Sequence, residues 1–265
     1  MINIKNHFII FALIIMFLII QSVFAITTPR GSQVSDTCNP SEYDDPDYIA
    51  YLNNYYDEAY PNATRLGDAS NTYNCHGYAW HMSEGGGTIM IGCNSSTAED
   101  IYWTDGSYDE MPSVAYATKV RYSGNHSAIT TSGGNYISKW GGGPLYRHAP
   151  NYCPGSYGSS YKYYVRSVDV PQDYSSIADA SDEAVIGQTI IVTSGTHTES
   201  NSSTINSGVT LQLNPGVTLR MANGKKLTIN GTLSAQGTYN NRITFQSSSG
   251  TWYGIELNYC SSTTL

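Results

Sequence analysis

The sequence predicts an α+β domain followed by an all-β segment, and two observations support this division. Residues 26–168 mix short helical and strand patterns with clusters of Tyr, Asp, Gly and His. From residue 169 to 265 the pattern changes to short alternating apolar runs that are separated by Gly, Asn, Pro or Ser. Without its N-terminal leader, a chain of about 240 residues can bury one large core or two modest ones.

Residues 1–25 have the three parts of an export signal peptide. Lys5 is the only cation of the leader, an apolar run extends from Phe8 to Ile20, and small residues precede an expected cleavage after Ala25. An uncleaved anchor is the alternative, but the run is short against the roughly 20 residues that span a bilayer. We therefore expect a secreted or cell-surface protein with no stable membrane span after cleavage.

Charge and cysteine content narrow the expected partners and the compartment. The formal net charge is −8 and the chain has no basic stripe, which argues against binding to a nucleic-acid backbone. Export makes disulfide pairing the default for the five cysteines. Cys93–Cys153 is the favoured pair, and Cys260 is expected to be a lone buried thiol.

Cys75 is the strongest candidate for chemistry. It follows Asn74, a good helix N-cap, in the segment NATRLGDASNTYNCHGYAWHM, and a helix-compatible run continues to Met82. A cysteine at a helix N-terminus is stabilised as the thiolate, the form that acts as a nucleophile. Two alternatives remain open, namely half of a disulfide or a zinc site with His76 and His81, although that spacing fits no usual ligand pair.

A histidine-bearing hairpin follows in the segment RYSGNHSAITTSGGNYISKWGGGPLYRHAP. The pattern predicts a strand from His126 to Thr130, a turn at residues 132–135 and a strand from Tyr136 to Trp140. His126 begins the first strand, and Ser138 lies near the end of the second.

Cys75 and this hairpin together resemble papain-like hydrolases, in particular the NlpC-type cell-wall endopeptidases. The resemblance implies that Cys75 is the nucleophile and His126 the general base. Where the family usually has a third catalytic His, Asn or Gln, this chain has Ser138, and His148 is a second candidate for that role. Ala69 occupies the position of the papain oxyanion glutamine, so the chain departs from the family there.

The resemblance implies attack of the Cys75 thiolate on an amide or peptide bond, with no cofactor and no metal. The expected substrate is an extracellular polymer, whether cell-wall peptide, protein or polysaccharide. The candidates for substrate contact are Lys139, Trp140, Arg147, Tyr73 and Asn74.

The C-terminal segment begins with VPQDYSSIADASDEAVIGQTIIVTSGTHTE at residues 170–199, which predicts a turn, a short helix and a buried strand. It resembles the N-terminal cap and first rung of right-handed parallel β-helices of the pectate-lyase-like superfamily. KKLTINGTLSAQGTYNNRITFQSSSGTWYGIEL, residues 225–257, resembles their repeating rungs. The chain stops soon after a strand, so we expect a truncated β-helix from a longer protein.

These observations leave three functional hypotheses. The first is an exported cysteine peptidase or amidase whose β-helix tail has a binding or display role. The second is a non-catalytic secreted module in which a degenerate papain-like shell accompanies a β-helix that recognises polysaccharide or a surface. A polysaccharide lyase centred on the β-helix ranks last, because the chain ends before such a site could be built.

Overall fold

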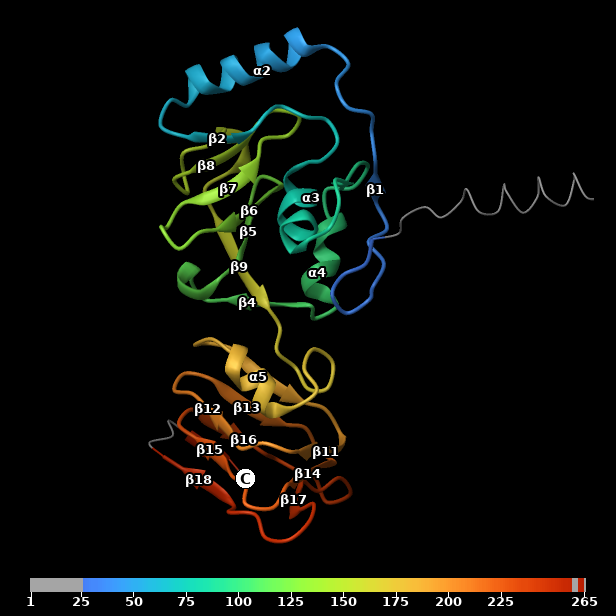
Figure 1. The fold of residues 1–265 in the computed structure, drawn as a ribbon, viewed down its shortest axis with the longest axis vertical. Coiled ribbons are helices and arrows are strands. Elements are labelled where there is room, and N and C mark those ends of the chain that lie inside the picture. The colour runs from blue at the N-terminus through green and yellow to red at the C-terminus, as the bar shows by residue number, and fades with distance from the viewer. Residues whose placement is uncertain (1–25, 259–261, 265) are drawn as a thin grey trace, which may run out of the picture.

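The structure of the chain is a computed structural model that describes residues 26–258 and the backbone of residues 262–264. The predicted leader and Cys260 lie outside the described residues. The described part is a mixed α/β fold with few helices and many strands, arranged as an N-terminal body and a C-terminal stack (Figure 1). None of its helices is long and apolar enough to cross a membrane.

A seven-stranded antiparallel sheet forms the centre of the N-terminal body, with the order β2-β8-β7-β6-β5-β9-β4. Its strands are β2 (Thr64–Gly67), β4 (Tyr108–Met111), β5 (Lys119–Tyr122), β6 (His126–Thr130), β7 (Tyr136–Lys139), β8 (Leu145–His148) and β9 (Tyr161–Arg166). The predicted hairpin is confirmed as β6 and β7, which pair at Ile129↔Ile137. The second strand ends one residue before the predicted Trp140.

Short helices and a small ladder surround this sheet (Figure 1). The helices are α2 (Pro46–Ala59), α3 (Cys75–Trp80) and α4 (Ile101–Thr104), with 3₁₀ turns η1 (Met82–Glu84), η2 (Ala98–Asp100), η3 (Val114–Tyr116) and η4 (Gly155–Tyr157). The ladder pairs β1 (Thr37–Cys38) with β3 (Met90–Ile91). Trp80 of α3 packs with Tyr102, Tyr108 and Tyr164 in a buried aromatic core, which holds α3 against the sheet.

The disulfide joins Cys38 to Cys93, so the predicted Cys93–Cys153 pair is wrong. Antiparallel pairing of β1 with β3 places Cys38 opposite Met90, only a short turn from Cys93. Cys153 instead is a half-buried free thiol whose Sγ faces the carbonyl of Pro150. The prediction failed because a long-range pairing of strands decides the disulfide, and no local pattern around the cysteines indicates that pairing.

The C-terminal stack consists of three parallel sheets, β10-β13-β16-β19, β11-β14-β17 and β12-β15-β18. Its strands are β10 (Thr189–Val192), β11 (Gly195–Glu199), β12 (Ser203–Ile205), β13 (Thr210–Leu213), β14 (Val217–Met221), β15 (Leu227–Ile229), β16 (Thr232–Ser234), β17 (Thr244–Ser247), β18 (Ile255–Leu257) and β19 (Ser262–Thr264). Ile190, Leu211 and Leu233 align across successive strands and are fully buried. Each layer therefore buries the apolar face of the next.

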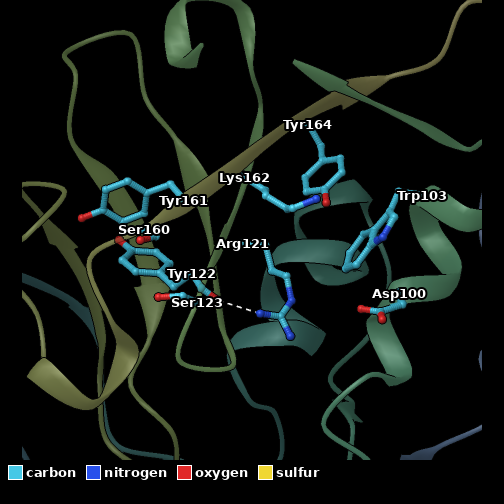
Figure 2. Close-up of a pocket in the computed structure, with 9 residues that line it drawn as sticks. All are labelled: Asp100, Trp103, Arg121, Tyr122, Ser123, Ser160, Tyr161, Lys162 and Tyr164. Atoms are coloured by element: carbon cyan, nitrogen blue, oxygen red, sulfur yellow. Dashed lines mark hydrogen bonds between the residues drawn. The ribbon is translucent and has the colours of Figure 1, made fainter. Parts of the chain in front are cut away.

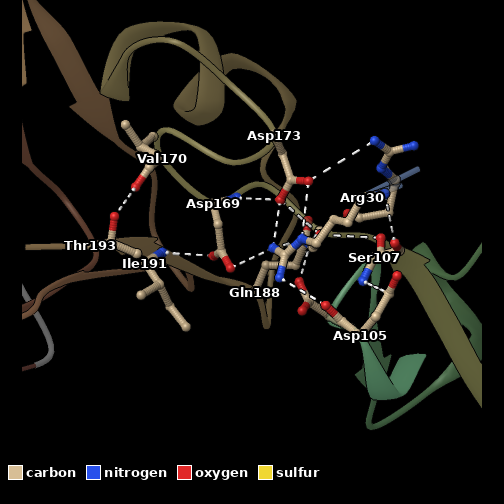
Figure 3. A network of polar contacts seen from close by, with 12 residues as sticks. Arg30, Asp105, Ser107, Asp169, Val170, Asp173, Gln188, Ile191 and Thr193 are labelled. Carbon is tan, nitrogen blue, oxygen red and sulfur yellow. Dashed lines mark hydrogen bonds and ion pairs between the residues drawn. The ribbon is translucent and has the colours of Figure 1, made fainter. Parts of the chain in front are cut away.

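The helix α5 (Ile177–Glu183) lies over the end of the stack that faces the N-terminal body (Figure 1). A polar network joins the two parts (Figure 3). Arg30 Nη2 lies 2.7 Å from Asp169 Oδ2 and 2.8 Å from Asp173 Oδ2. Gln188 Nε2 donates to Asp109 Oδ2 over 2.9 Å. Hydrogen bonds and ion pairs thus fix the two parts to each other.

Candidate functional site

Cys75 is the first residue of α3, as the sequence predicts, and its thiol is free. The side chain of Asn74 caps the helix, because its Oδ1 accepts from the N–H of Gly77 at 2.8 Å. The same amide also accepts from the N–H of Ile91 and donates to its carbonyl. These contacts occupy the Asn74 side chain and hold α3 against β3.

The helix α3 packs on β6 through a buried serine. Ser127 Oγ lies 2.8 Å from His76 Nδ1 and 2.9 Å from Trp80 Nε1, which donates to it. Ser127 follows His126 directly in β6. The packing therefore brings the first turn of α3, with Cys75, to the strand that carries His126.

The Cys75 side chain is 7% exposed, and opposing effects act on its thiol. Burial raises the pKa of Cys75. The charge and hydrogen bond of His76 and the backbone N–H of Ser127 lower this pKa, and together they outweigh burial. The net direction is a lowered pKa. At neutral pH a larger fraction of Cys75 is therefore in the thiolate form than in an ordinary cysteine.

His126 is completely buried and lies flat against Tyr157. The two ring centroids are 3.6 Å apart and the rings are parallel. Neither nitrogen of His126 has a hydrogen-bond partner within the described residues, Cys75 Sγ included. Burial lowers the pKa of His126 to about 3, so the ring is neutral at physiological pH. Burial raises the pKa of Tyr157, and the charge of a Cys75 thiolate adds to this rise.

The two candidates for a third catalytic residue contact each other and not His126. Ser138 Oγ lies 2.8 Å from His148 Nε2, and Trp140 Nε1 donates to Ser138 Oγ at 3.0 Å. His148 Nδ1 lies 2.8 Å from the carbonyl of Ala149. Burial and the neighbouring His126 lower the pKa of His148 to about 4. The structure therefore shows a buried Trp-Ser-His chain with no orienting contact to His126.

The predicted substrate contacts divide into buried and accessible residues. Lys139 is wholly buried; its ammonium donates to the carbonyls of Ser70, Gly141 and Gly143 and lies 4.8 Å from the centre of the Tyr73 ring. Trp140 is 1% exposed beneath Tyr60 and Tyr146, so it offers no open platform. Arg147 is exposed and Tyr73 is half-buried. Of this set, Arg147 and Tyr73 remain available to a substrate.

Sequence reasoning missed a buried cluster beside Cys75. Glu99 is 0% exposed, and its Oε1 lies 3.0 Å from Arg121 Nε and 3.6 Å from His76 Nδ1. The adjacency of His76 to Cys75 was a signal, but it pointed only to a metal site. Glu99 and Tyr157 have no local signal, because they reach the site from η2 and η4 through tertiary packing. In the part of the chain that the structure describes, no group of three or more His, Cys, Asp or Glu is arranged to hold a metal ion.

A pocket of about 490 Å³ lies between β5, β9 and α4 (Figure 2). It is lined by Asp100, Trp103, Arg121, Tyr122, Ser123, Ser160, Tyr161, Lys162 and Tyr164. Its two cations already face carboxylates, since Arg121 binds Glu99 and Lys162 binds Glu110. The pocket therefore touches the buried cluster through Arg121 but has no unpaired charge to select an anionic ligand.

No match is found when the chain is compared with known protein families, with curated proteins or with solved structures.

Proposed function

We propose that the chain is an exported cysteine hydrolase that cleaves an amide or peptide bond of an extracellular polymer, with Cys75 as nucleophile and His126 as general base. One observation supports this function most strongly. Cys75 is a free thiol with a lowered pKa, and it lies where the first turn of α3 meets the strand that carries His126. A papain-like arrangement places a cysteine and a histidine on these same kinds of element.

The mechanism follows from the state of each group. His126 is neutral at physiological pH, and neither of its ring nitrogens has a hydrogen-bond partner among the described residues. In this proposal it takes the proton of Cys75 during the reaction and becomes an imidazolium. The Cys75 thiolate attacks the carbonyl carbon, the leaving amine takes a proton from the imidazolium, and water then releases the acyl group. The Cys75 backbone N–H, at the first position of α3, is the proposed oxyanion donor. Ala69 N–H is already used, since it donates to Asn53 Oδ1 at 2.8 Å.

The C-terminal stack is proposed to be the start of a right-handed parallel β-helix of the pectate-lyase-like kind. Parallel pairing in register, such as Thr210↔Thr232, supports this proposal. We propose that this stack has a binding or display role at the cell surface.

Labelling of the mature chain with iodoacetamide across pH tests the nucleophile. We expect Cys75 to be labelled with a midpoint below the ordinary ~8.5 of a free cysteine. Cys153 is the matched internal control, because burial raises its pKa to about 11. A Cys75 that is oxidised, or that titrates like an ordinary thiol, would contradict the nucleophile assignment.

Hydrolysis of cell-wall peptide and of unfolded protein tests the reaction. We expect Cys75→Ala to abolish cleavage and His126→Gln to slow it by about 10²-fold or more, since a general base contributes about that much. Cys153→Ala is expected to retain full activity. Cleavage that survives in Cys75→Ala would assign the chemistry elsewhere.

A second candidate, the non-catalytic binding module, is favoured by one observation. The bond between Ser138 and His148 leaves His126 without an orienting partner in the described residues. This candidate predicts that the wild-type chain and Cys75→Ala bind polysaccharide equally and that neither releases product. Sedimentation with insoluble polymer, followed by analysis of the soluble fraction for fragments, separates the two functions.

A further inference from the structure

The pocket between β5, β9 and α4 takes no part in the proposed chemistry (Figure 2). Strand pairing builds one of its walls, because Arg121 on β5 lies opposite Lys162 on β9. Side chains two positions apart on a strand share a face, so Tyr164 belongs to the same wall as Lys162. The rings of Tyr122 and Tyr161 turn away from this wall and pack in the apolar cluster on the other face of the sheet.

The second wall comes from the turn that joins η2 to α4. Asp100 ends η2 and Trp103 lies in α4, and side chains three positions apart on a helical turn are neighbours. The Trp103 indole stacks on the Tyr164 ring, with the centroids 4.8 Å apart and the planes at 21°. Trp103 is half-buried, so part of this supported indole is open to a ligand.

The charges of the pocket favour a neutral ligand. Arg121 Nε lies 3.0 Å from Glu99 Oε1, and Lys162 Nζ lies 2.9 Å from Glu110 Oε2, so both cations are paired. The Asp100 carboxylate makes no hydrogen bond or ion pair with the other residues that the structure describes. An anionic ligand would meet the charge of Asp100, and a cationic ligand would meet Arg121 and Lys162.

Donors and acceptors are both available for hydrogen bonds to a ligand. The Asp100 carboxylate can accept, and the Lys162 ammonium, whose side chain is 59% exposed, uses only one of its N–H groups on Glu110. Ser123 and Ser160 are exposed, and their hydroxyls can donate or accept. A ligand with several neighbouring hydroxyl groups matches this mixture, because each hydroxyl can donate to a carboxylate and accept from an ammonium.

We propose that this pocket binds a neutral sugar segment of a polysaccharide, with the C–H face of one ring on Trp103 and hydroxyls bonded to Asp100 and Lys162. Its volume of about 490 Å³ is typical of a small-ligand pocket. Tyr164 also packs against Trp80 of α3, so the pocket and α3 share one face of the sheet. The inference goes beyond the proposed hydrolysis and does not rest on it.

Isothermal titration calorimetry on the mature chain tests the ligand class. The neutral probes are cellotriose, xylotriose and tri-N-acetylchitotriose, and the charged probes are the glucosamine trimer and trigalacturonate. We expect at least one neutral trisaccharide to bind with a Kd of about 1 mM or tighter, and both charged probes to bind at least about tenfold more weakly. The glucosamine trimer is a matched probe, because it differs from tri-N-acetylchitotriose only by the acetyl groups. No binding of any neutral probe, or tighter binding of a charged one, would overturn the inference.

Variants of the two walls test the position of the sugar. We expect Trp103→Ala to weaken binding by about tenfold or more, because the stacking surface is lost. Asp100→Asn is expected to weaken it about fivefold, since a neutral amide replaces a charged acceptor. The controls are Tyr116→Ala, at a 43% exposed ring on η3, and Asp182→Asn, at an exposed position of α5, and neither should change the affinity. Binding that is equal in all four variants would place the sugar elsewhere and refute the pocket.

Folding and chemistry are separated from sugar binding by further measurements. Near-ultraviolet circular dichroism checks the fold of Trp103→Ala, and Asp100→Asn covers the case in which that variant does not fold. Cys75→Ala is expected to bind the neutral sugar like the wild type. A chain that binds sugar in the pocket but cleaves no polymer keeps this inference and loses the hydrolase assignment. Cleavage without sugar binding that depends on Trp103 and Asp100 would do the reverse.

Discussion

At the residue scale, the state of each histidine follows from what surrounds it. Three buried histidines lie on or near α3, β6 and β8, yet their partners are a carboxylate and a serine for His76, a phenol ring for His126 and a serine for His148. Burial alone disfavours the charged imidazolium. A nearby carboxylate opposes that effect, so the same residue type is suited to different roles within one site.

Tyr157→Ala tests the origin of the low pKa of His126. Burial is the only cause of the shift from 6.5 to about 3, and the Tyr157 ring covers the imidazole. We expect the pKa of His126 to rise toward 6.5 when water reaches the ring. NMR titration of the His126 ring protons measures it. An unchanged value would mean that the sheet and not Tyr157 excludes water.

The same variant has a predicted signature in stability. A neutral native His126 contributes stability above pH 6.5 that is lost as the pH falls toward 3, because the unfolded chain then binds a proton that the native state does not. With a raised native pKa, Tyr157→Ala is expected to lose less stability between pH 6.5 and 4 than the wild type. Urea unfolding at several pH values measures this slope.

At the element scale, the position of α3 depends on a close backbone approach. A Cβ added to Gly77 would lie 1.8 Å from the carbonyl oxygen of Ile89, which is far inside van der Waals contact. The absence of a side chain therefore lets α3 lie against the segment that leads into β3. The N-cap Asn74 secures the same contact from the other side through Ile91. Both features set the place of Cys75.

Gly77→Ala is expected to destabilise the fold by about 1–3 kcal/mol through overpacking, despite the better helix propensity of alanine. It should also slow Cys75 alkylation at neutral pH, because α3 moves away from Ser127. Gly87→Ala is the control, since a Cβ there meets nothing within 4 Å. Urea unfolding and alkylation measure the two effects. Equal behaviour of the two variants would contradict the close-approach argument.

At the scale of the whole molecule, two parts with different kinds of sheet are joined by polar contacts. Arg30, from the N-terminal segment, reaches Asp169 and Asp173 in the connection to the stack (Figure 3). Asp173 is 2% exposed, and its carboxylate also accepts from Ser167 Oγ. A buried carboxylate of this kind depends on its cation.

Arg30→Ala is expected to destabilise the chain by about 3 kcal/mol, because it leaves the Asp173 carboxylate buried without its main cation. For a chain of this size that corresponds to a fall of roughly 6–12 °C in Tm. Arg220→Ala, at an exposed position of β14, is the control. Calorimetry measures both. A change no larger than that of Arg220→Ala would show that the apolar contacts alone hold the two parts.

Local signals predicted the elements that carry the site. Asn74 before Cys75 predicted the helix start, and alternation around the glycines at 133 and 134 predicted the β6–β7 hairpin. The change of pattern near residue 169 predicted parallel stacked strands, which β10 to β18 form. These elements depend on interactions between residues that are close in the sequence, so they can be predicted from it.

The sequence by itself determined the helix that begins at Cys75, the β6–β7 hairpin and the stacked strands of the C-terminal part. Only the tertiary structure decided the partners: Cys93 with Cys38, Ser138 with His148, and His76 with Glu99. Pairings of this kind depend on strand register and on which faces pack together. They are set by burial summed over the whole core, which no local pattern records.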